Sequence, residues 1–215
     1  MPFEDAPLAT DVVPAIVAVM RKPRVALAHH WSLITPAMET AATGSVRLTL
    51  VLGGARSGKS RYAESLITAR APPWLYVATA EARDEEMAER IAVHQQRRAA
   101  GWHTIEAPHD LAGALGAAPA EAPVLIDCLT LWLSNRMLAD IDVDAEMARF
   151  EEALDRRAGM VVLVSNEVGF GIVPDNALAR RFRDLQGRLN QRIAARADRV
   201  ALVVAGLPLI VKGCT

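Results

Sequence analysis

The chain has 215 residues, with 24 Lys or Arg and 25 Asp or Glu, and a formal net charge of −1. That length suits one domain with a substantial core, and the balanced charge argues against a broad nucleic-acid footprint or a polybasic membrane anchor. Two cysteines, Cys128 and Cys214, are too few for a disulfide framework, which favours a reducing cytoplasm. The apolar stretch 200–211 is interrupted by Gly206 and Pro208 and is too short to span a bilayer. We therefore expect a cytoplasmic protein with no stable membrane insertion and no nucleic-acid partner.

Residues 1–45 differ from the rest of the chain: they contain five prolines and show no convincing core pattern. We treat them as an N-terminal extension, poorly ordered or docked on the surface, and assign them no chemistry. Met38 is an alternative natural start. Residues 46–215 form the predicted functional domain.

From residue 46 onward, apolar runs alternate with helical patterns. Strands are predicted at 46–52, 74–79, 102–106, 124–126 ending at Asp127, 160–164, 199–204 and, after a turn at 206–208, at the edge segment 209–212. Helices are predicted at 61–70, 84–99, 110–116, 129–138, 143–157 and 176–197. Buried strands separated by helices imply a mostly parallel sheet covered on both faces, which is a three-layer α/β fold. Ligands of such a fold bind at the carboxyl ends of the strands.

The most informative motif directly follows the first predicted strand. Residues 53–60 read Gly-Gly-Ala-Arg-Ser-Gly-Lys-Ser, which is a complete G-x-x-x-x-G-K-[ST] phosphate loop. The glycines allow successive N–H groups to turn inward around a polyphosphate, while the lysine reaches the outer phosphates and the last serine ligates magnesium. The alternative is a Gly-rich turn that only starts a helix. The motif predicts an NTP site made by Gly53, Gly54, Ala55, Arg56, Ser57, Gly58, Lys59 and Ser60.

Asp127 ends a predicted core strand, where a carboxylate is placed to hold Mg²⁺ directly or through water. The alternative is an N-cap for the helix that starts near Leu129. Because a phosphate loop is present, we favour the metal role, with Ser60 and Asp127 as the metal-binding pair.

The segment 165–174, Ser-Asn-Glu-Val-Gly-Phe-Gly-Ile-Val-Pro, leaves the next buried strand in the same way. Such a loop is a good place to bind the acceptor substrate, because Asn166 and Glu167 would project over the nucleotide. The other reading is a turn that packs Val168 and Ile172. Periodicity alone leaves both open.

His94 lies on the predicted helix 84–99, four residues after Arg90, with Arg97 and Arg98 following it on the same helix. A neutral imidazole is a good nucleophile toward phosphorus, and nearby guanidinium groups would stabilise charge on a transferring phosphoryl group. By spacing alone, a solvated basic helix face is the better reading.

Several separate segments resemble one family, the bifunctional adenosylcobinamide kinase / adenosylcobinamide-phosphate guanylyltransferase. They cover about residues 46–213 in register, so they are far more specific than the phosphate loop alone. The segments are 53–64, the run Met-Ala-Glu-Arg-Ile-Ala-Val-His at 87–94, 102–106, 165–174, 181–191 and 197–198.

The resemblance implies a RecA-like P-loop fold, a homotrimer and two activities. One phosphorylates adenosylcobinamide with an NTP, ATP or GTP, in the presence of Mg²⁺; the other joins adenosylcobinamide phosphate to GMP from GTP through a guanylylated histidine. By position that histidine is His94, which with Lys59 makes the catalytic pair. Beyond the phosphate loop, the implied nucleotide contacts are Ala78, Thr79, Ala80, Gln95, Gln96, Arg97, Arg98, Glu106 and Asp127.

Two alternatives stay open at this point. One is a small-molecule P-loop kinase without guanylyl transfer, in which His94 only contacts phosphate. The other, supported by fold class only, is a non-enzymatic NTP-dependent regulator or a strand-exchange module.

Overall fold

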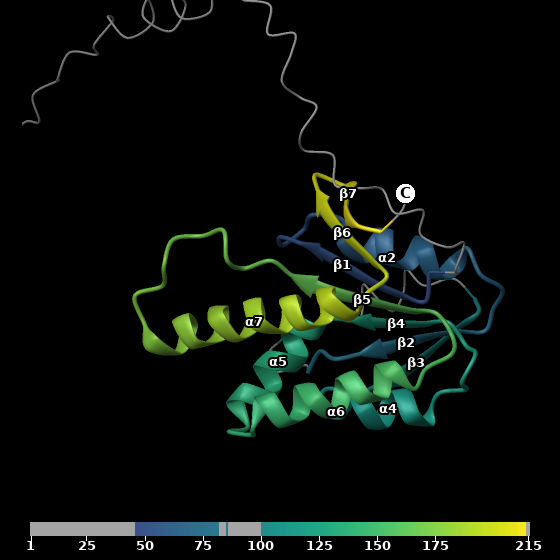
Figure 1. Cartoon of the computed structure of the whole chain (residues 1–215), viewed down its shortest axis with the longest axis horizontal. Helices are drawn as coiled ribbons and strands as arrows, with labels where there is room; N and C mark the ends of the chain where they lie inside the picture. Colours follow the sequence, from purple (N-terminus) through teal and green to yellow (C-terminus); the bar gives the residue numbers. More distant parts are fainter. Residues whose placement is uncertain (1–45, 82–84, 86–99, 214–215) are drawn as a thin grey trace, which may run out of the picture. The chain divides into compact units, whose positions relative to one another are not determined.

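The computed structural model describes residues 46–81, 85 and 100–213, which belong to a compact unit running from Ser45 to Thr215. Seven strands in this part of the chain form one sheet (Figure 1). They are β1 (Leu48–Gly53), β2 (Trp74–Ala78), β3 (Trp102–Glu106), β4 (Val124–Asp127), β5 (Val161–Asn166), β6 (Arg199–Val204) and β7 (Leu207–Lys212). The helices are α2 (Lys59–Thr68), α4 (Leu111–Ala117), α5 (Leu129–Leu138), α6 (Val143–Asp155) and α7 (Ala177–Arg196). The predicted helix over 84–99 lies outside the described residues apart from Glu85.

The strand order is β3-β2-β4-β5-β1-β6-β7, and every neighbouring pair runs parallel except β6 and β7. Strand β5 lies between β1, which leads into the phosphate loop, and β4, which ends at Asp127. One strand between these two is characteristic of the RecA-like strand order. The mostly parallel P-loop fold predicted from the sequence is therefore confirmed.

Alternate residues of the buried strands pack on opposite faces of the sheet, as a period of two requires. Leu50 belongs to a large core that α4, α5, α6 and α7 cover, whereas Val51 belongs to a smaller core beneath Ala63 and Ile67 of α2. Because both faces carry apolar side chains, the central strands read as continuous apolar runs.

Three helices begin at a polar cap that the sequence supplies. The side chains of Asp110, Asp142 and Asn176 accept hydrogen bonds from the first-turn N–H groups of α4, α6 and α7. Such caps satisfy N–H groups that have no partner within the helix. Among the helices in the described part of the chain, none combines the length and apolarity needed to cross a membrane.

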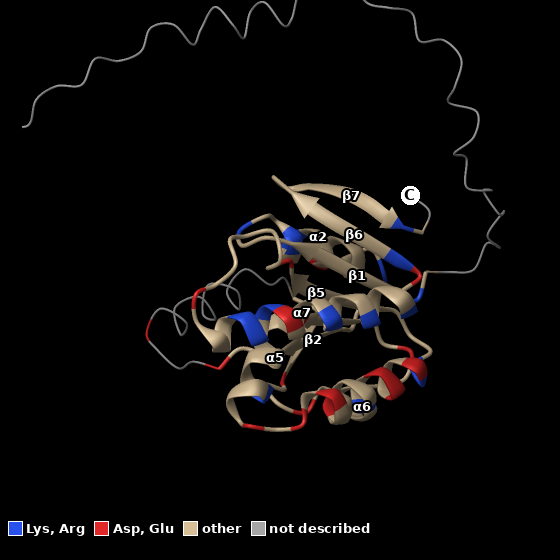
Figure 2. Cartoon of the chain, turned by 60° about the vertical axis from the view of Figure 1, so that its left-hand side comes forward, with Lys and Arg blue, Asp and Glu red and all other residues tan. Residues whose placement is uncertain are grey.

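Helices α6 and α7 are joined by an ion cluster centred on Glu151, whose side chain is 8% exposed. Its two carboxylate oxygens lie 2.5 Å from Arg192 Nε and 2.9 Å from Arg196. Figure 2 shows the acidic residues of α6 and the basic residues of α7 along the two helices. Burial raises the pKa of Glu151, but the two guanidinium groups outweigh burial and hold it below its usual value.

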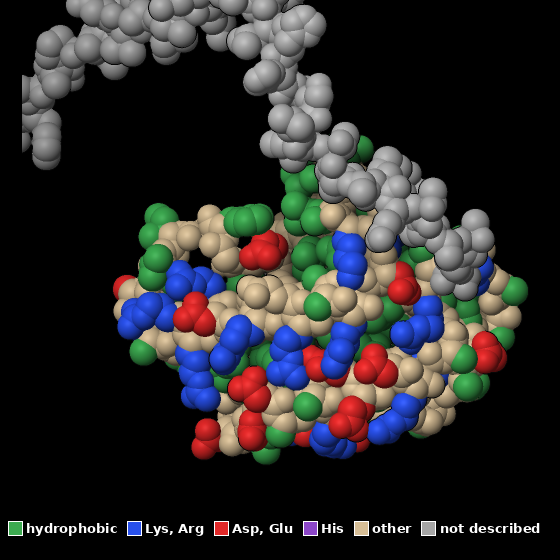
Figure 3. Space-filling view, in the orientation of Figure 1, with side chains coloured by type: hydrophobic (Ala, Val, Ile, Leu, Met, Phe, Trp, Pro, Cys, Tyr) green, Lys and Arg blue, Asp and Glu red, His purple; other side chains and the backbone are tan. Residues whose placement is uncertain are grey.

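The last two strands form a hairpin with a tight turn at Ala205 and Gly206, which have φ values of 52° and 82°. Two central residues with positive φ are the requirement of a type I′ turn. The sequence placed the turn at 206–208 and the strand from Leu209, and this boundary was wrong, because β7 already begins at Leu207. Its apolar side chains are exposed and contribute to the green patch at the top of Figure 3.

Candidate functional site

The carboxyl ends of the parallel strands meet at one edge of the sheet, and the described site residues lie along it. Gly53 at the end of β1 is the partner of Asn166 on β5, while Ala78 on β2 lies between Glu106 and Asp127. Counting strands at about 4.8 Å each, Asp127 is about 10 Å from the phosphate loop strand and Glu106 about 19 Å. The fold thus brings Asp127 near the loop and leaves Glu106 farther along the same edge.

The phosphate loop needs glycine at two positions for different reasons. Gly58 has a φ of 95°, which is left-handed and favours a residue without a β-carbon. Gly53 is surrounded closely: a Cβ there would lie 2.5 Å from Ser57 Oγ and 2.7 Å from the carbonyl oxygen of Val203. The motif glycines are therefore required by this conformation.

Between residues 53 and 57, the carbonyl groups of Gly53, Gly54 and Ser57 accept hydrogen bonds from main-chain N–H groups. The donors are, in that order, Glu167 at 3.1 Å, Ser57 at 3.3 Å and Gly206 at 2.8 Å. In a trans peptide the N–H points opposite to the C=O. Each bond therefore turns the N–H of the following residue away from these partners, which is how a loop presents its amides to an anion.

Helix α2 starts at Lys59, directly after the loop, so its first N–H groups have no carbonyl partner within the helix. A helix N-terminus with such groups favours bound phosphate. Lys59 Nζ donates a hydrogen bond to the carbonyl oxygen of Gly54 at 3.0 Å, so the ammonium group lies across the loop. Ser60, the next residue, lies in the first turn.

Asp127 is half-buried at the end of β4, and the structure does not use it as an N-cap. Cys128 is the cap residue of α5, without a capping hydrogen bond from its side chain. Burial and then the charge of Asp127 raise the pKa of the Cys128 thiol to about 11, while the charge of Lys59 lowers it. Asp127 and Lys59 thus both lie near one buried thiol.

The hydroxyl of Ser60 and the carboxylate of Asp127 suit Mg²⁺, which prefers oxygen ligands. In the described ranges, no cluster of three or more His, Cys, Asp or Glu could hold a metal by itself. Mg²⁺ is commonly bound by one or two protein oxygens together with substrate phosphates, and the pair fits that pattern.

The loops that follow β2 and β3 are tied together by Asn135 of α5, which the sequence analysis missed. Its Nδ2 donates to the carbonyl oxygens of Thr79 at 2.9 Å and Pro108 at 3.1 Å. The buried Thr79 hydroxyl is itself bonded to the main chain of Cys128. The implied nucleotide contact Ala80 therefore lies on a fixed loop, and Ala78 lies at the strand end that leads into it. A polar residue on the apolar face of a helix was the available signal for Asn135.

A buried polar network holds the end of β5, which the sequence also did not reveal. Asn190 Nδ2 of α7 donates to the carbonyl oxygen of Asn166 at 3.0 Å, and Asn190 Oδ1 accepts from Ser165 Oγ at 2.7 Å. Gln186 donates to Ser165 and to Asn190, and Thr130 of α5 accepts from the Asn166 N–H. The strand end beside the phosphate loop is thus fixed by two helices.

The loop after β5 exposes Phe170, Ile172 and Val173, whereas Val168 is half-buried. Phe170 is 85% exposed and Ile172 is 97% exposed, so Ile172 does not pack as the turn interpretation expected. Glu167 uses its carboxylate locally, accepting from the Gly169 N–H at 2.8 Å.

Five predicted site residues, all on the 84–99 segment, lie outside the described residues. They are the proposed nucleophile His94 and the nucleotide contacts Gln95, Gln96, Arg97 and Arg98.

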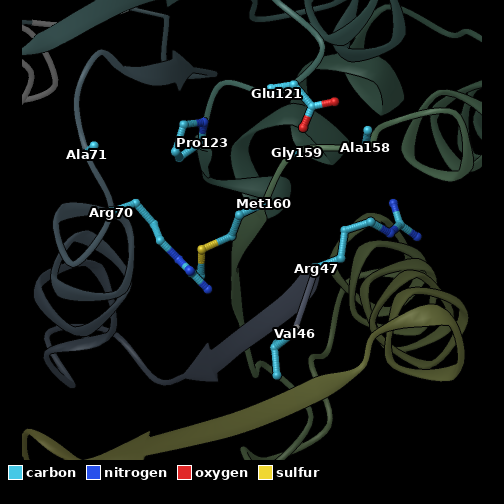
Figure 4. A pocket seen from close by; sticks show the side chains of 9 residues that line it. All are labelled: Val46, Arg47, Arg70, Ala71, Glu121, Pro123, Ala158, Gly159 and Met160. Carbon is cyan, nitrogen blue, oxygen red and sulfur yellow. The ribbon is translucent and has the colours of Figure 1, made fainter. Parts of the chain in front are cut away.

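A hollow of about 310 Å³ lies at the opposite edge of the sheet, where β1, β4 and β5 begin. Arg70 and Met160 extend toward each other across it, whereas Arg47 turns away (Figure 4). Arg47 donates to the carbonyl oxygens of Leu154 and Arg157, a structural role. The hollow is remote from the phosphate loop and is no part of the candidate site.

The family described as cobinamide kinase / cobinamide phosphate guanyltransferase matches residues 49–211. The bifunctional adenosylcobalamin biosynthesis protein CobP of Pseudomonas aeruginosa is 49% identical over 167 residues, covering 76% of this chain and 96% of that protein. The bifunctional adenosylcobalamin biosynthesis protein CobU of Salmonella typhimurium is 44% identical over 182 residues, covering 77% and 99%. Among solved structures, an ATPase of a bacterial type III secretion system superposes with a TM-score of 0.42 at 11% identity, covering 76% of this chain and 56% of that one.

Proposed function

This chain belongs to the cobinamide kinase / cobinamide phosphate guanyltransferase family, and on that premise we propose that it phosphorylates adenosylcobinamide and then joins the product to GMP. The observation that carries the proposal is the phosphate loop between β1 and α2, with Asp127 two strands away at the same sheet edge. The whole arrangement lies within the matched residues 49–211.

In the kinase reaction, the amides of the loop and Lys59 hold the phosphates of ATP or GTP. The aminopropanol hydroxyl oxygen of adenosylcobinamide attacks the γ-phosphorus, the bond to the bridging oxygen breaks, and the nucleoside diphosphate leaves as the hydroxyl proton passes to solvent. Ser60 and Asp127 would hold Mg²⁺, which neutralises charge on the phosphates when bound. Lys59 stabilises the charge that develops on the transferring oxygens.

In the second reaction, a nitrogen of His94 attacks the α-phosphorus of GTP and pyrophosphate leaves, so that a phosphoramidate joins the imidazole to GMP. A phosphate oxygen of adenosylcobinamide phosphate then attacks the same phosphorus. The N–P bond breaks, the imidazole is restored, and the product carries a new phosphoanhydride bond. The support for His94 is its position in the segment that resembles the family.

The remaining proposed contacts follow the sheet edge. Ala78 ends β2 beside Asp127, Thr79 and Ala80 follow it, and Glu106 ends β3 farther from the loop. We assign Glu106 to the nucleoside end of the bound nucleotide, because it lies about four strands from β1. Gln95 to Arg98 complete the set. We also propose that the enzyme works in the cytoplasm as a homotrimer, which light scattering of the purified protein tests.

The decisive experiment compares label from α-labelled and γ-labelled GTP on the denatured protein. Label from α-labelled GTP should remain attached, label from γ-labelled GTP should not, and mild acid should release it, since a phosphoramidate is labile in acid. His94→Ala should lose the adduct and the guanylyl transfer but keep phosphorylation of adenosylcobinamide. Acid-stable label, or α-label retained by folded His94→Ala, would refute the nucleophile. Phosphorylated adenosylcobinamide as the sole product, identified by mass, would instead indicate a kinase without guanylyl transfer.

A further inference from the structure

The turn of the β6–β7 hairpin lies directly against the phosphate loop, although nearly 150 residues separate them in the chain. The N–H of Gly206 donates to the carbonyl oxygen of Ser57 at 2.8 Å. A Cβ at Gly58 would lie 3.1 Å from the Cα atom of Gly206, so the two main chains are in close contact. No side chain mediates this hydrogen bond.

This hydrogen bond acts on the peptide group that joins Ser57 to Gly58. The peptide is trans, because among the described residues cis bonds occur at Pro72-Pro73 and Asp127-Cys128. In a planar trans peptide the C=O and N–H point in opposite directions. Holding the Ser57 oxygen toward the hairpin therefore directs the Gly58 N–H away from it, to the side of the loop where phosphate binds.

The hairpin can make this bond because its turn is tight. Ala205 and Gly206 take φ values of 52° and 82°, and strand pairing resumes at once between Val204 and Leu207. A longer loop would displace the Gly206 N–H from Ser57. The opposite side of the phosphate loop is held in the same way just after β5, where the Glu167 N–H donates to the carbonyl oxygen of Gly53.

We propose that Gly206 is a positioning residue of the nucleotide site, whose main-chain N–H orients the Gly58 amide toward the bound phosphates. The β6–β7 hairpin then helps to form the nucleotide site, in addition to forming the edge of the sheet. The proposal rests on nucleotide binding by the loop, which is part of the proposed function, but it requires neither of the two transfer reactions.

The test measures the dissociation constants of Mg²⁺-GTP and of GMP by calorimetry on the full chain. One variant inserts a glycine between Ala205 and Gly206, and a second, Gly206→Ala, keeps the chain length. Among the described residues, its two chain neighbours aside, no atom lies within 4 Å of the position of a new Cβ at residue 206, so Gly206→Ala acts there through its positive φ. The matched control inserts a glycine after Asp140, in the turn between α5 and α6. Asp140, like Ala205, is a non-glycine residue with a positive φ. Ala205→Gly keeps the turn and serves as the conservative variant.

The insertion at 205 should raise the dissociation constant of Mg²⁺-GTP about tenfold, the factor expected for a misplaced hydrogen bond to a charged group. Gly206→Ala should raise it about threefold, and the affinity for GMP should fall less in both variants, since fewer phosphates contact the loop. The control insertion and Ala205→Gly should stay within about twofold of the parent chain. The proposal would be overturned if the insertion variant and Gly206→Ala both bound Mg²⁺-GTP as tightly as the parent chain. It would also be overturned if their affinity for GMP fell by the same factor as their affinity for Mg²⁺-GTP. A parent chain that binds GTP but transfers nothing would refute the proposed function and leave this inference intact.

Discussion

The side chain of Thr79 and the main chain of Cys128 are joined by two hydrogen bonds. Thr79 Oγ1 accepts from the Cys128 N–H at 2.7 Å and donates to the Cys128 carbonyl oxygen at 2.8 Å. Thr79 is buried, and the peptide that it holds follows Asp127 directly. The Thr79 hydroxyl thus fixes the backbone next to Asp127, whose carboxylate is the proposed metal ligand.

Replacing Thr79 should therefore impair catalysis through Asp127. Thr79→Val keeps the shape but removes the acceptor of the Cys128 N–H, whereas the Cys128 carbonyl oxygen still accepts from the Trp132 N–H at 3.3 Å. We expect kcat to fall about tenfold or more and stability to fall by about 2 kcal/mol. Thr79→Ser retains the hydroxyl and should keep most of the activity. Steady-state kinetics at several Mg²⁺ concentrations measures the effect. Equal kcat values for the folded Val and Ser variants would rule out this role.

Lys59→Ala should abolish both reactions while the fold remains, because one loop positions the phosphates in each. We expect kcat/KM to fall at least about a hundredfold, the usual cost of losing one donor to the developing charge. The matched control is Lys212→Ala at the end of β7, whose ammonium group donates to the carbonyl oxygens of Ala194 and Ala195. That variant should lose a little stability and keep its turnover. Kinase turnover at the parent rate in folded Lys59→Ala would contradict the assignment.

Deleting residues 1–45 should leave both activities within about twofold of the full chain, since the family match begins at residue 49 and the site elements follow it. The measurement is kcat/KM of each reaction, with thermal unfolding as the check on folding. A large drop in a folded truncated enzyme would show that the extension contributes to the site or to assembly.

Glu151→Gln should lower the free energy of unfolding at pH 7 by about 1–2 kcal/mol, because it removes the charge that Arg192 and Arg196 share. The folded pKa of Glu151 lies below its unfolded value, so its charge stabilises the fold above the unfolded pKa. That contribution is lost as the pH falls through the folded pKa, and the two proteins should converge in acid. Glu152→Gln, on the same helix but 66% exposed, is the control and should change stability by less than about 0.5 kcal/mol. An equal effect of the two substitutions in denaturant titrations would exclude the buried cluster as the cause.

The sequence by itself determined the helices and strands and the chemistry of the phosphate loop, because both depend on residues that are close together in the chain. Apolar runs and helical periodicity placed β3 at 102–106 and α5 at 129–138, as observed. The motif glycines Gly53 and Gly58 predicted a loop conformation that requires residues without a β-carbon at these two positions. The family resemblance, carried by several short segments, is confirmed by the match over residues 49–211.

Only the tertiary structure decided which distant groups support the site. The hydrogen bonds from Gly206 to Ser57 and from Asn190 to Asn166 join residues far apart in sequence, and no local pattern encodes them. The sequence pattern placed the turn at Ala205 and Gly206 too late in the chain because an alanine with positive φ, such as Ala205, is unusual. The conformational free energy that this φ costs is tolerated where the surrounding structure fixes the turn. Strand order brought Asp127 to within two strands of the phosphate loop, since the packing of both sheet faces against helices, and not any single segment, sets which strands are neighbours.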